Sequence, residues 1–156
     1  MKSVFIRFSL IGLVAVLLQI LIFRHLGFGV MEPDFVLLIL IWVIATQNRT
    51  RSLLFAAYSG LLIDLFLDLW GLHMLSKTLT TFIVYPFIPK EEDSRLFLTQ
   101  IMVLIFVIAL VHNLLFLIFA FFAQIYHAEL IFFQILFGSS LLTAIIGSII
   151  YLFKDN

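Results

Sequence analysis

The sequence predicts an all-α integral membrane protein in which six transmembrane helices form one compact bundle. Two observations lead to this prediction. The 156 residues are 64% hydrophobic and only 12% charged, whereas an ordinary soluble domain carries roughly 25% charged residues. The hydrophobic residues also form blocks close to the ~20 residues that are needed to cross a hydrocarbon core. We therefore expect a single transmembrane helical domain over residues 1–156.

Short polar breaks separate the apolar blocks and set the expected helix boundaries. Arg24 to Asp34 holds glycines and a proline, Gln47 to Ser52 holds two arginines, and Pro89 to Arg95 is largely charged. Gly71 and residues 127–129 mark two weaker breaks. The expected spans are about 8–23, 35–46, 53–70, 72–88, 96–126 and 131–153. The second is short, so it is expected to begin inside the preceding loop or to lie in a thinned or protein-lined region.

The distribution of positive charge predicts the orientation, because loops rich in Lys and Arg stay in the cytoplasm. With six spans and an internal N-terminus, only Arg24 and Lys77 of the nine basic residues lie toward the outside. The opposite orientation would invert this bias. We therefore expect both termini in the cytoplasm. The seven basic residues expected there are Lys2, Arg7, Arg49, Arg51, Lys90, Arg95 and Lys154.

Composition excludes several classes of function. The chain has no cysteine, which excludes disulfides, thiol catalysis and cysteine-based metal sites. Its net charge is zero and it has no basic cluster, so we expect no nucleic-acid partner. The phosphate-binding, dinucleotide-binding, hydrolase and zinc-protease motifs are missing from the sequence. We therefore expect no enzymatic activity, no cofactor and no metal site.

The third apolar block carries a stripe of small and acidic residues. Ser52, Ala56, Gly60, Asp64 and Asp68 follow one another at intervals of four, which places them on one helix face. A carboxylate that faced lipid near the bilayer centre would cost on the order of 3 kcal/mol. Small residues also let helix backbones approach each other closely. This face should therefore contact protein.

The fourth block offers basic groups to this stripe. His73 and Lys77 share a face, and the turn at Gly71 should make the two helices antiparallel neighbours, which would place Asp68 within reach of either. The cluster of Asp64, Asp68, His73 and Lys77 is either a structural clamp of buried polar groups or a proton or ion relay. The clamp is favoured, because a relay needs a chain of such groups across the membrane.

Two surfaces are possible partner-binding sites. The last block has a broad small-residue face, and both internal packing and partner binding would explain it. This face has Ser140, Ala144 and Ser148 in one stripe and Ser139, Thr143 and Gly147 in the next. The second surface is an outer corner formed by Glu32, Asp34, Asp68 and Lys77. In the fifth block, His112 and Asn113 favour interhelical hydrogen bonding over a metal site. The same interpretation applies to Gln19 and Gln134.

The order of motifs between Pro33 and Pro89 resembles the MreD family of rod-shape-determining membrane proteins. The motifs are Pro33-Asp34 before an apolar helix, a basic loop at Arg49 to Arg51, Gly60-Leu-Leu-Ile-Asp64, Leu69-Trp70-Gly71-Leu72-His73 and Tyr85-Pro86. The motifs follow one another in this order. The fourth motif precedes an apolar helix, and this helix ends near Tyr85-Pro86. They cover about a third of the chain, and its overall length and span number extend the likeness.

This resemblance implies a non-catalytic scaffold of the cell-elongation machinery in the bacterial inner membrane. An MreC-like single-pass membrane protein would be its partner. RodA with its penicillin-binding protein would join the same complex, and the MreB cytoskeleton would be linked indirectly. The resemblance also implies a fold similar to the substrate-binding subunits of energy-coupling-factor transporters. The alternative function is a small-solute-binding subunit of a transporter, with Asp68, His73 and Lys77 as its candidate lining.

Overall fold

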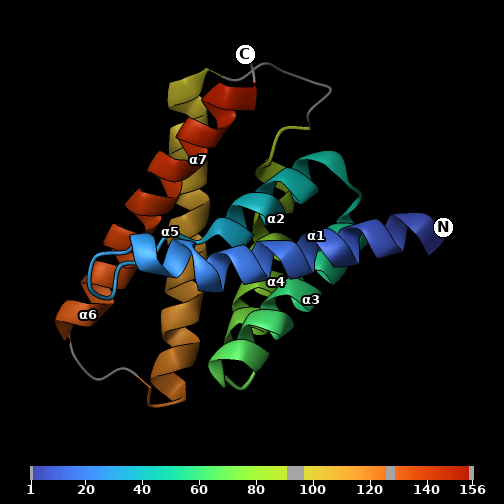
Figure 1. Cartoon of the computed structure of the whole chain (residues 1–156). Coiled ribbons are helices and arrows are strands. Elements are labelled where there is room, and N and C mark those ends of the chain that lie inside the picture. The colour runs from blue at the N-terminus through green and yellow to red at the C-terminus, as the bar shows by residue number, and fades with distance from the viewer. Residues whose placement is uncertain (1, 91–96, 126–128, 155–156) are drawn as a thin grey trace.

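The computed structural model describes residues 2–90, 97–125 and 129–154, and the long elements of this part of the chain are all helices (Figure 1). The all-α prediction is therefore confirmed. A π-helical turn, Gln134–Ser139, joins α6 to α7, and short 3-10 helices follow α1 and α4. The helices are α1 Lys2–Leu21, α2 Phe35–Thr46, α3 Arg49–Leu67, α4 Leu72–Val84, α5 Leu98–Phe122, α6 Glu129–Phe133 and α7 Ser140–Lys154.

Among the described residues, three helical stretches are long and apolar enough to cross a membrane. They are Arg49–Leu67, Leu98–Phe122 and Leu130–Phe153. Two further apolar helices, Ile6–Leu21 and Phe35–Thr46, are shorter. A bilayer core needs ~20 helical residues, so the length and composition of these three stretches indicate a membrane protein.

The helix boundaries differ from the expected spans at several ends. α2 coincides with the expected segment 35–46, whereas α3 begins at Arg49 and ends at Leu67 rather than covering 53–70. It starts early because the Asn48 side chain accepts a hydrogen bond from the Arg51 amide at 3.0 Å. It ends early because Asp68 takes a left-handed conformation with φ of 55°.

The other ends shift by a few residues. α1 ends at Leu21, α4 at Val84 and α5 at Phe122, each short of its expected end. Residues 91–96 and 126–128, on which two expected breaks and the ends of a predicted span fall, lie outside the described residues.

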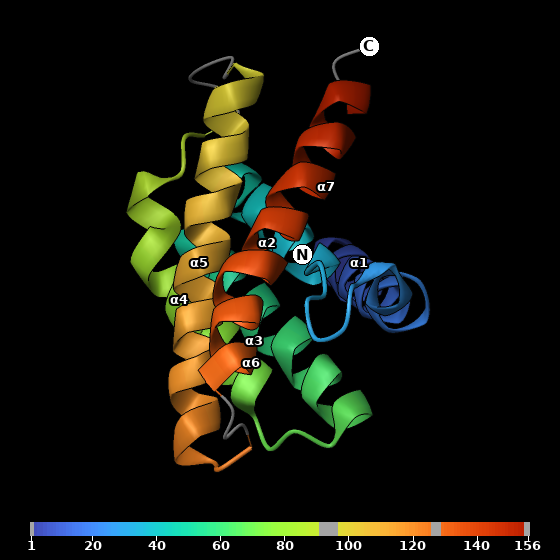
Figure 2. The same ribbon diagram turned by 90° about the vertical axis from the view of Figure 1, so that its left-hand side faces the viewer.

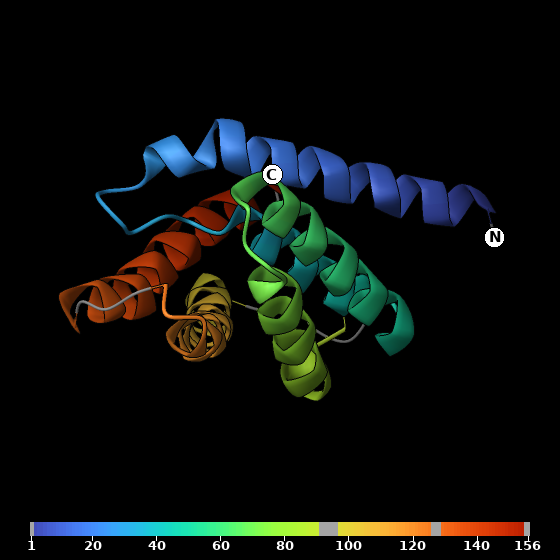
Figure 3. The ribbon, with the colours of Figure 1, turned by 90° about the horizontal axis from the view of Figure 1, so that it is seen from below.

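α2 lies in the middle of the bundle. It contacts α1, α3, α5 and α7, while α3 packs on α4, α4 on α5, and α5 on α7. α5 and α7 run side by side (Figures 1 and 2), whereas α1 crosses the molecule at a steep angle to both and passes along α3 (Figures 1 and 3). This central position explains how so short a helix is tolerated: Val36, Leu40 and Val43 are fully buried against protein.

Basic residues gather where α2 ends and α3 begins. The Arg49 guanidinium lies 4.4 Å from the centre of the Phe82 ring, near the end of α4. Lys90 Nζ donates to the Ile44 carbonyl at 2.6 Å, and the Tyr85 hydroxyl donates to that of Gln47 at 3.3 Å. Arg51 Nη1 donates to Gln47 Oε1 at 3.1 Å, so Arg49, Arg51 and Lys90 lie at one end of the bundle. The loop at residues 22–34 and the turn at residues 68–71 meet at the other, here named the loop end.

Candidate functional site

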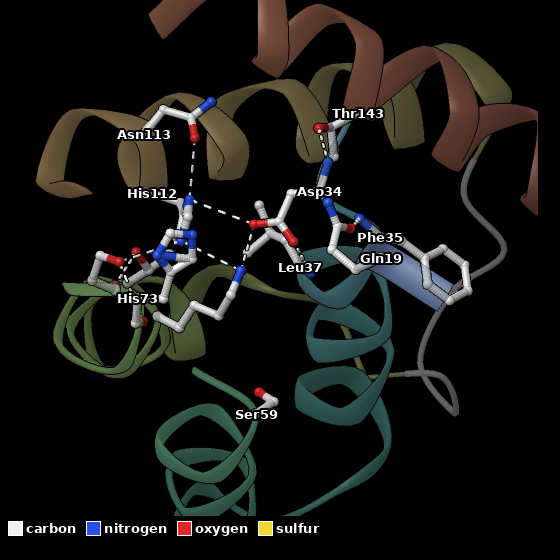
Figure 4. A network of polar contacts seen from close by, with 12 residues as sticks. Gln19, Asp34, Phe35, Leu37, Ser59, His73, His112, Asn113 and Thr143 are labelled. Carbon is white, nitrogen blue, oxygen red and sulfur yellow. Dashed lines mark hydrogen bonds and ion pairs between the residues drawn. The ribbon is translucent and has the colours of Figure 1, made fainter. Parts of the chain in front are cut away.

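A buried polar network joins four helices near the loop end (Figure 4). Asp34 stands before α2, Ser76 and Lys77 come from α4, His112 and Asn113 from α5, and Ser140 from α7. Lys77 and Ser140 have no exposed surface, and His112 is 3% exposed. The buried polar network is defined as Asp34, Ser76, Lys77, His112, Asn113 and Ser140.

An ion pair between Lys77 and Asp34 forms its centre. Lys77 Nζ donates to Asp34 Oδ2. The other carboxylate oxygen, Oδ1, accepts from the Leu37 amide at 2.7 Å and so caps α2. His112 Nδ1 lies 3.9 Å from Asp34 Oδ2. A lone buried charge is very costly, whereas a paired and hydrogen-bonded one is tolerated. The pair therefore holds α2 against α4 with no net charge.

Asn113 connects the network to the π-helical turn. Its Oδ1 lies 3.2 Å from His112 Nδ1, while its Nδ2 donates to Ser140 Oγ at 2.9 Å and to the Ile135 carbonyl at 3.3 Å. Backbone hydrogen bonding changes register in a π-helical turn, and such turns are often found at functional sites. Interhelical hydrogen bonding, the interpretation favoured for His112 and Asn113, is confirmed. Among the described residues, no group of three or more His, Cys, Asp or Glu residues is arranged to hold a metal ion.

Gln19 of α1 fixes the segment that carries Asp34. Its Nε2 donates to the Pro33 carbonyl at 2.9 Å, and its Oε1 accepts from the Phe35 amide at 2.6 Å. One side-chain amide thus satisfies backbone groups on both sides of Asp34. The position of the Asp34 carboxylate is therefore fixed in part by α1, through the side chain of Gln19.

The last helix holds the same segment from the opposite side. Ser139 Oγ accepts from the Glu32 amide at 3.1 Å, and Thr143 Oγ1 accepts from the Asp34 amide at 2.9 Å. Both hydroxyls belong to the small-residue face identified in the sequence. This face therefore binds the chain's own loop.

The remaining small residues of the last helix are also used in internal packing. Ala144 is 0% and Ser148 is 7% exposed. A Cβ atom on Gly147 would lie 2.6 Å from Leu38 Cδ2 and 2.7 Å from Ile105 Cδ1. Of the two interpretations left open, the structure selects internal packing, so Ser140, Ala144, Gly147 and Ser148 are not a free partner-binding surface.

The expected cluster of Asp64, Asp68, His73 and Lys77 is divided in the structure. Asp64 is 5% exposed, and its two carboxylate oxygens accept from the His73 and Met74 amides, each at 2.9 Å. Asp68 is exposed at the end of α3, and the partner of Lys77 is Asp34 instead. The outer corner is divided likewise, with Asp34 and Lys77 inside the buried polar network and Glu32 in the loop above it. Only part of each predicted grouping is thus brought together.

Asp64 provides an N-terminal cap for α4 from the neighbouring helix. We expect Asp64→Asn to lower the free energy of unfolding by about 1 kcal/mol, since the amide oxygen still accepts one hydrogen bond. Asp64→Leu should cost about 2–4 kcal/mol, because two buried amide groups lose their acceptor. Unfolding of both variants in mixed micelles measures the difference, and equal losses would contradict the capping role.

A cavity of about 630 Å³ lies beside the network at the loop end. Its lining comes from the loop, the end of α3, α4, α5 and the π-helical turn, and it includes Asp34, His73, His112 and Asn113. Glu32 lies above them, with its Oε1 3.5 Å from Arg24 Nε. Burial raises the pKa of the Glu32 carboxyl, and the nearby Arg24 opposes this shift. The arrangement can thus receive a small molecule next to a neutral ion pair.

Comparisons of the chain with protein-family models, curated proteins and solved structures find no match.

Sequence reasoning missed several residues that build the site. Gln19 was assigned only general interhelical hydrogen bonding, and Ser76 was not singled out. The only sequence signal for Ser139 and Thr143 was their place in the small-residue face. Their hydrogen bonds to the loop join residues more than a hundred positions apart, and helical periodicity within one segment does not show such a pairing.

Proposed function

We propose that the chain is a non-catalytic membrane scaffold of the bacterial cell-elongation machinery. The sequence resemblance to the MreD family suggests this role, with an MreC-like single-pass protein as the partner. RodA and its penicillin-binding protein would belong to the same complex, with the MreB cytoskeleton linked indirectly. The observation that supports the proposal best is the buried polar network, because its charged and amide groups are directed to one another and fix the helices relative to each other. Such rigidity suits a protein that positions others.

The proposed topology has six spans in the bacterial inner membrane and both termini in the cytoplasm. Its support is the gathering of Arg49 and Lys90 at one end of the bundle, since basic loops stay inside. Reporter fusions after Arg51, Arg95 and Asn156 should all read cytoplasmic, and a fusion near His127 should read external. A C-terminal fusion that reads external would refute the six-span arrangement.

Partner binding is tested by photocrosslinking, because the small-residue face of the last helix is occupied. Leu10 on α1, Leu65 on α3 and Val103 on α5 are 55%, 71% and 61% exposed, so a crosslinker at each position samples a different face. We expect at least one position to capture the MreC-like protein in cells, and depletion of the chain to turn rods into spheres. A buried position, Ala144, is the matched control that should not crosslink. Normal rod shape after depletion would reject the scaffold.

A second candidate function is the small-solute-binding subunit of a transporter. One observation favours it, namely the cavity of about 630 Å³ at the loop end. Ligand pockets typically measure roughly 300–1,000 Å³. Unchanged cell shape together with loss of uptake of one solute after depletion would select this function over the scaffold.

A further inference from the structure

We infer that the cavity at the loop end is a binding site for a small uncharged molecule that carries hydrogen-bond donors. This inference rests on the second candidate function and adds the class of ligand. Three properties of the cavity support this inference: its walls are fixed, its charges are paired, and the ring of His73 in its lining can accept a hydrogen bond.

The walls of the cavity are held in place without a ligand. The loop is tied to the last helix through Glu32 and Ser139 and to α1 through Gln19. Met31 packs directly on Gly138 in the π-helical turn, which has no side chain to keep the loop away. The loop, α1 and the last helix therefore form one wall, which is in place before any ligand binds. A preformed site avoids the free-energy cost of ordering during binding.

The charges of the cavity argue against a charged ligand. Among the described lining residues, the formal charges are those of Arg24, Glu32 and Asp34. Arg24 lies beside Glu32, and Asp34 is neutralised by Lys77 behind it. An ionic ligand that drew Asp34 away from Lys77 would leave a buried charge without its partner, which is costly. An uncharged ligand avoids this penalty.

His73 supplies the hydrogen-bonding group for such a ligand. Its Nδ1 is buried without a hydrogen-bond partner, 3.5 Å from Asp64 Oδ1, although the side chain as a whole is 17% exposed. With the proton on Nδ1, facing that carboxylate, Nε2 is an acceptor. The ring is held edge-on to Phe116, with the ring centres 4.7 Å apart. His73 lines the cavity, so we assign this acceptor to a donor on the ligand, beside the ring of Phe116.

The experiment uses the purified full-length protein in lipid nanodiscs. It is dialysed against a defined mixture of water-soluble metabolites with equal numbers of uncharged, zwitterionic, anionic and cationic members, and bound compounds are identified by native mass spectrometry. We expect enrichment of uncharged members only. Enrichment confined to charged or zwitterionic members, no enrichment, or a phospholipid retained in the cavity would each overturn the inference.

Three variants locate the binding. Val30→Trp, at the mouth of the cavity, should abolish enrichment, and Val103→Trp, on the exposed face of α5, should not. His73→Phe keeps the ring and the backbone amide that Asp64 accepts from, and it should weaken binding about tenfold through loss of one hydrogen bond. Equal binding by Val30→Trp and the native chain would overturn the inference. Because no transport is measured, failure of the transporter function would appear separately, in uptake by cells.

Discussion

Lys77→Met should lower the free energy of unfolding by about 3–5 kcal/mol, the typical effect of removing one partner from a buried ion pair. The substitution leaves the Asp34 carboxylate beside His112 and removes the lysine cation that donates to it. Met fills much of the space of the Lys stem, so the loss reports charge rather than volume. Unfolding in mixed micelles, followed by helical circular dichroism, measures it.

The double variant Asp34→Asn with Lys77→Met is the test of this explanation. It removes both charges, and the Asn side chain can still accept from the Leu37 amide and cap α2. We expect it to recover most of the lost stability, since replacing both partners is often nearly neutral. Arg51→Met, at an exposed position, should change stability by less than about 0.5 kcal/mol. A double variant as unstable as Lys77→Met would show that packing of the Lys77 stem, not its charge, is responsible.

The second large effect is expected at Gly60, where α3 and α4 meet closely. A Cβ atom there would lie 2.5 Å from Met74 Cα and 2.7 Å from the His73 carbonyl oxygen. Backbone atoms cannot rotate away as a side chain can, so the helices must separate. Gly60→Ala should therefore cost about 1–3 kcal/mol, and Gly60→Leu should prevent the folded protein from accumulating.

Separation of α3 from α4 also moves the Asp64 carboxylate away from the amides of His73 and Met74. Gly60→Ala combined with Asp64→Leu should hence be less destabilising than the sum of the two single effects. Leu61→Phe, on the exposed side of the same turn, is the control and should leave stability nearly unchanged. A Gly60→Ala protein as stable as the native chain would show that the two helices can separate without cost.

Features that depend on neighbouring residues could be predicted from the sequence. The Pro33-Asp34 pair predicted where α2 begins, and the small stripe on α3 predicted a close approach at Gly60. Both depend on a few adjacent turns of one helix. The early end of α3 was missed because the apolar pattern continues past Leu67 to Trp70 and does not reveal the left-handed conformation of Asp68.

Contacts between distant segments could not be predicted in the same way. Periodicity shows that Lys77 lies on the polar face of α4, but not that the loop before α2 approaches that face more closely than the end of α3 does. The partner of Lys77 was consequently expected to include Asp68, which is nearer in sequence than Asp34. The steep crossing of α1 likewise depends on how the whole bundle packs, and the sequence of α1 contains no signal for it.

The hydrogen bonds that Ser139 and Thr143 accept from the loop amides have a consequence for biogenesis. Residues 22–34 are synthesised well before the last helix. Until that helix is made, the Glu32 and Asp34 amides lack the hydroxyl acceptors of Ser139 and Thr143. Half-inserted chains thus keep two backbone amides that lipid cannot satisfy. Completion of the last helix supplies both acceptors, so we expect chains truncated before Gln134 to be degraded faster in the membrane than the full-length chain.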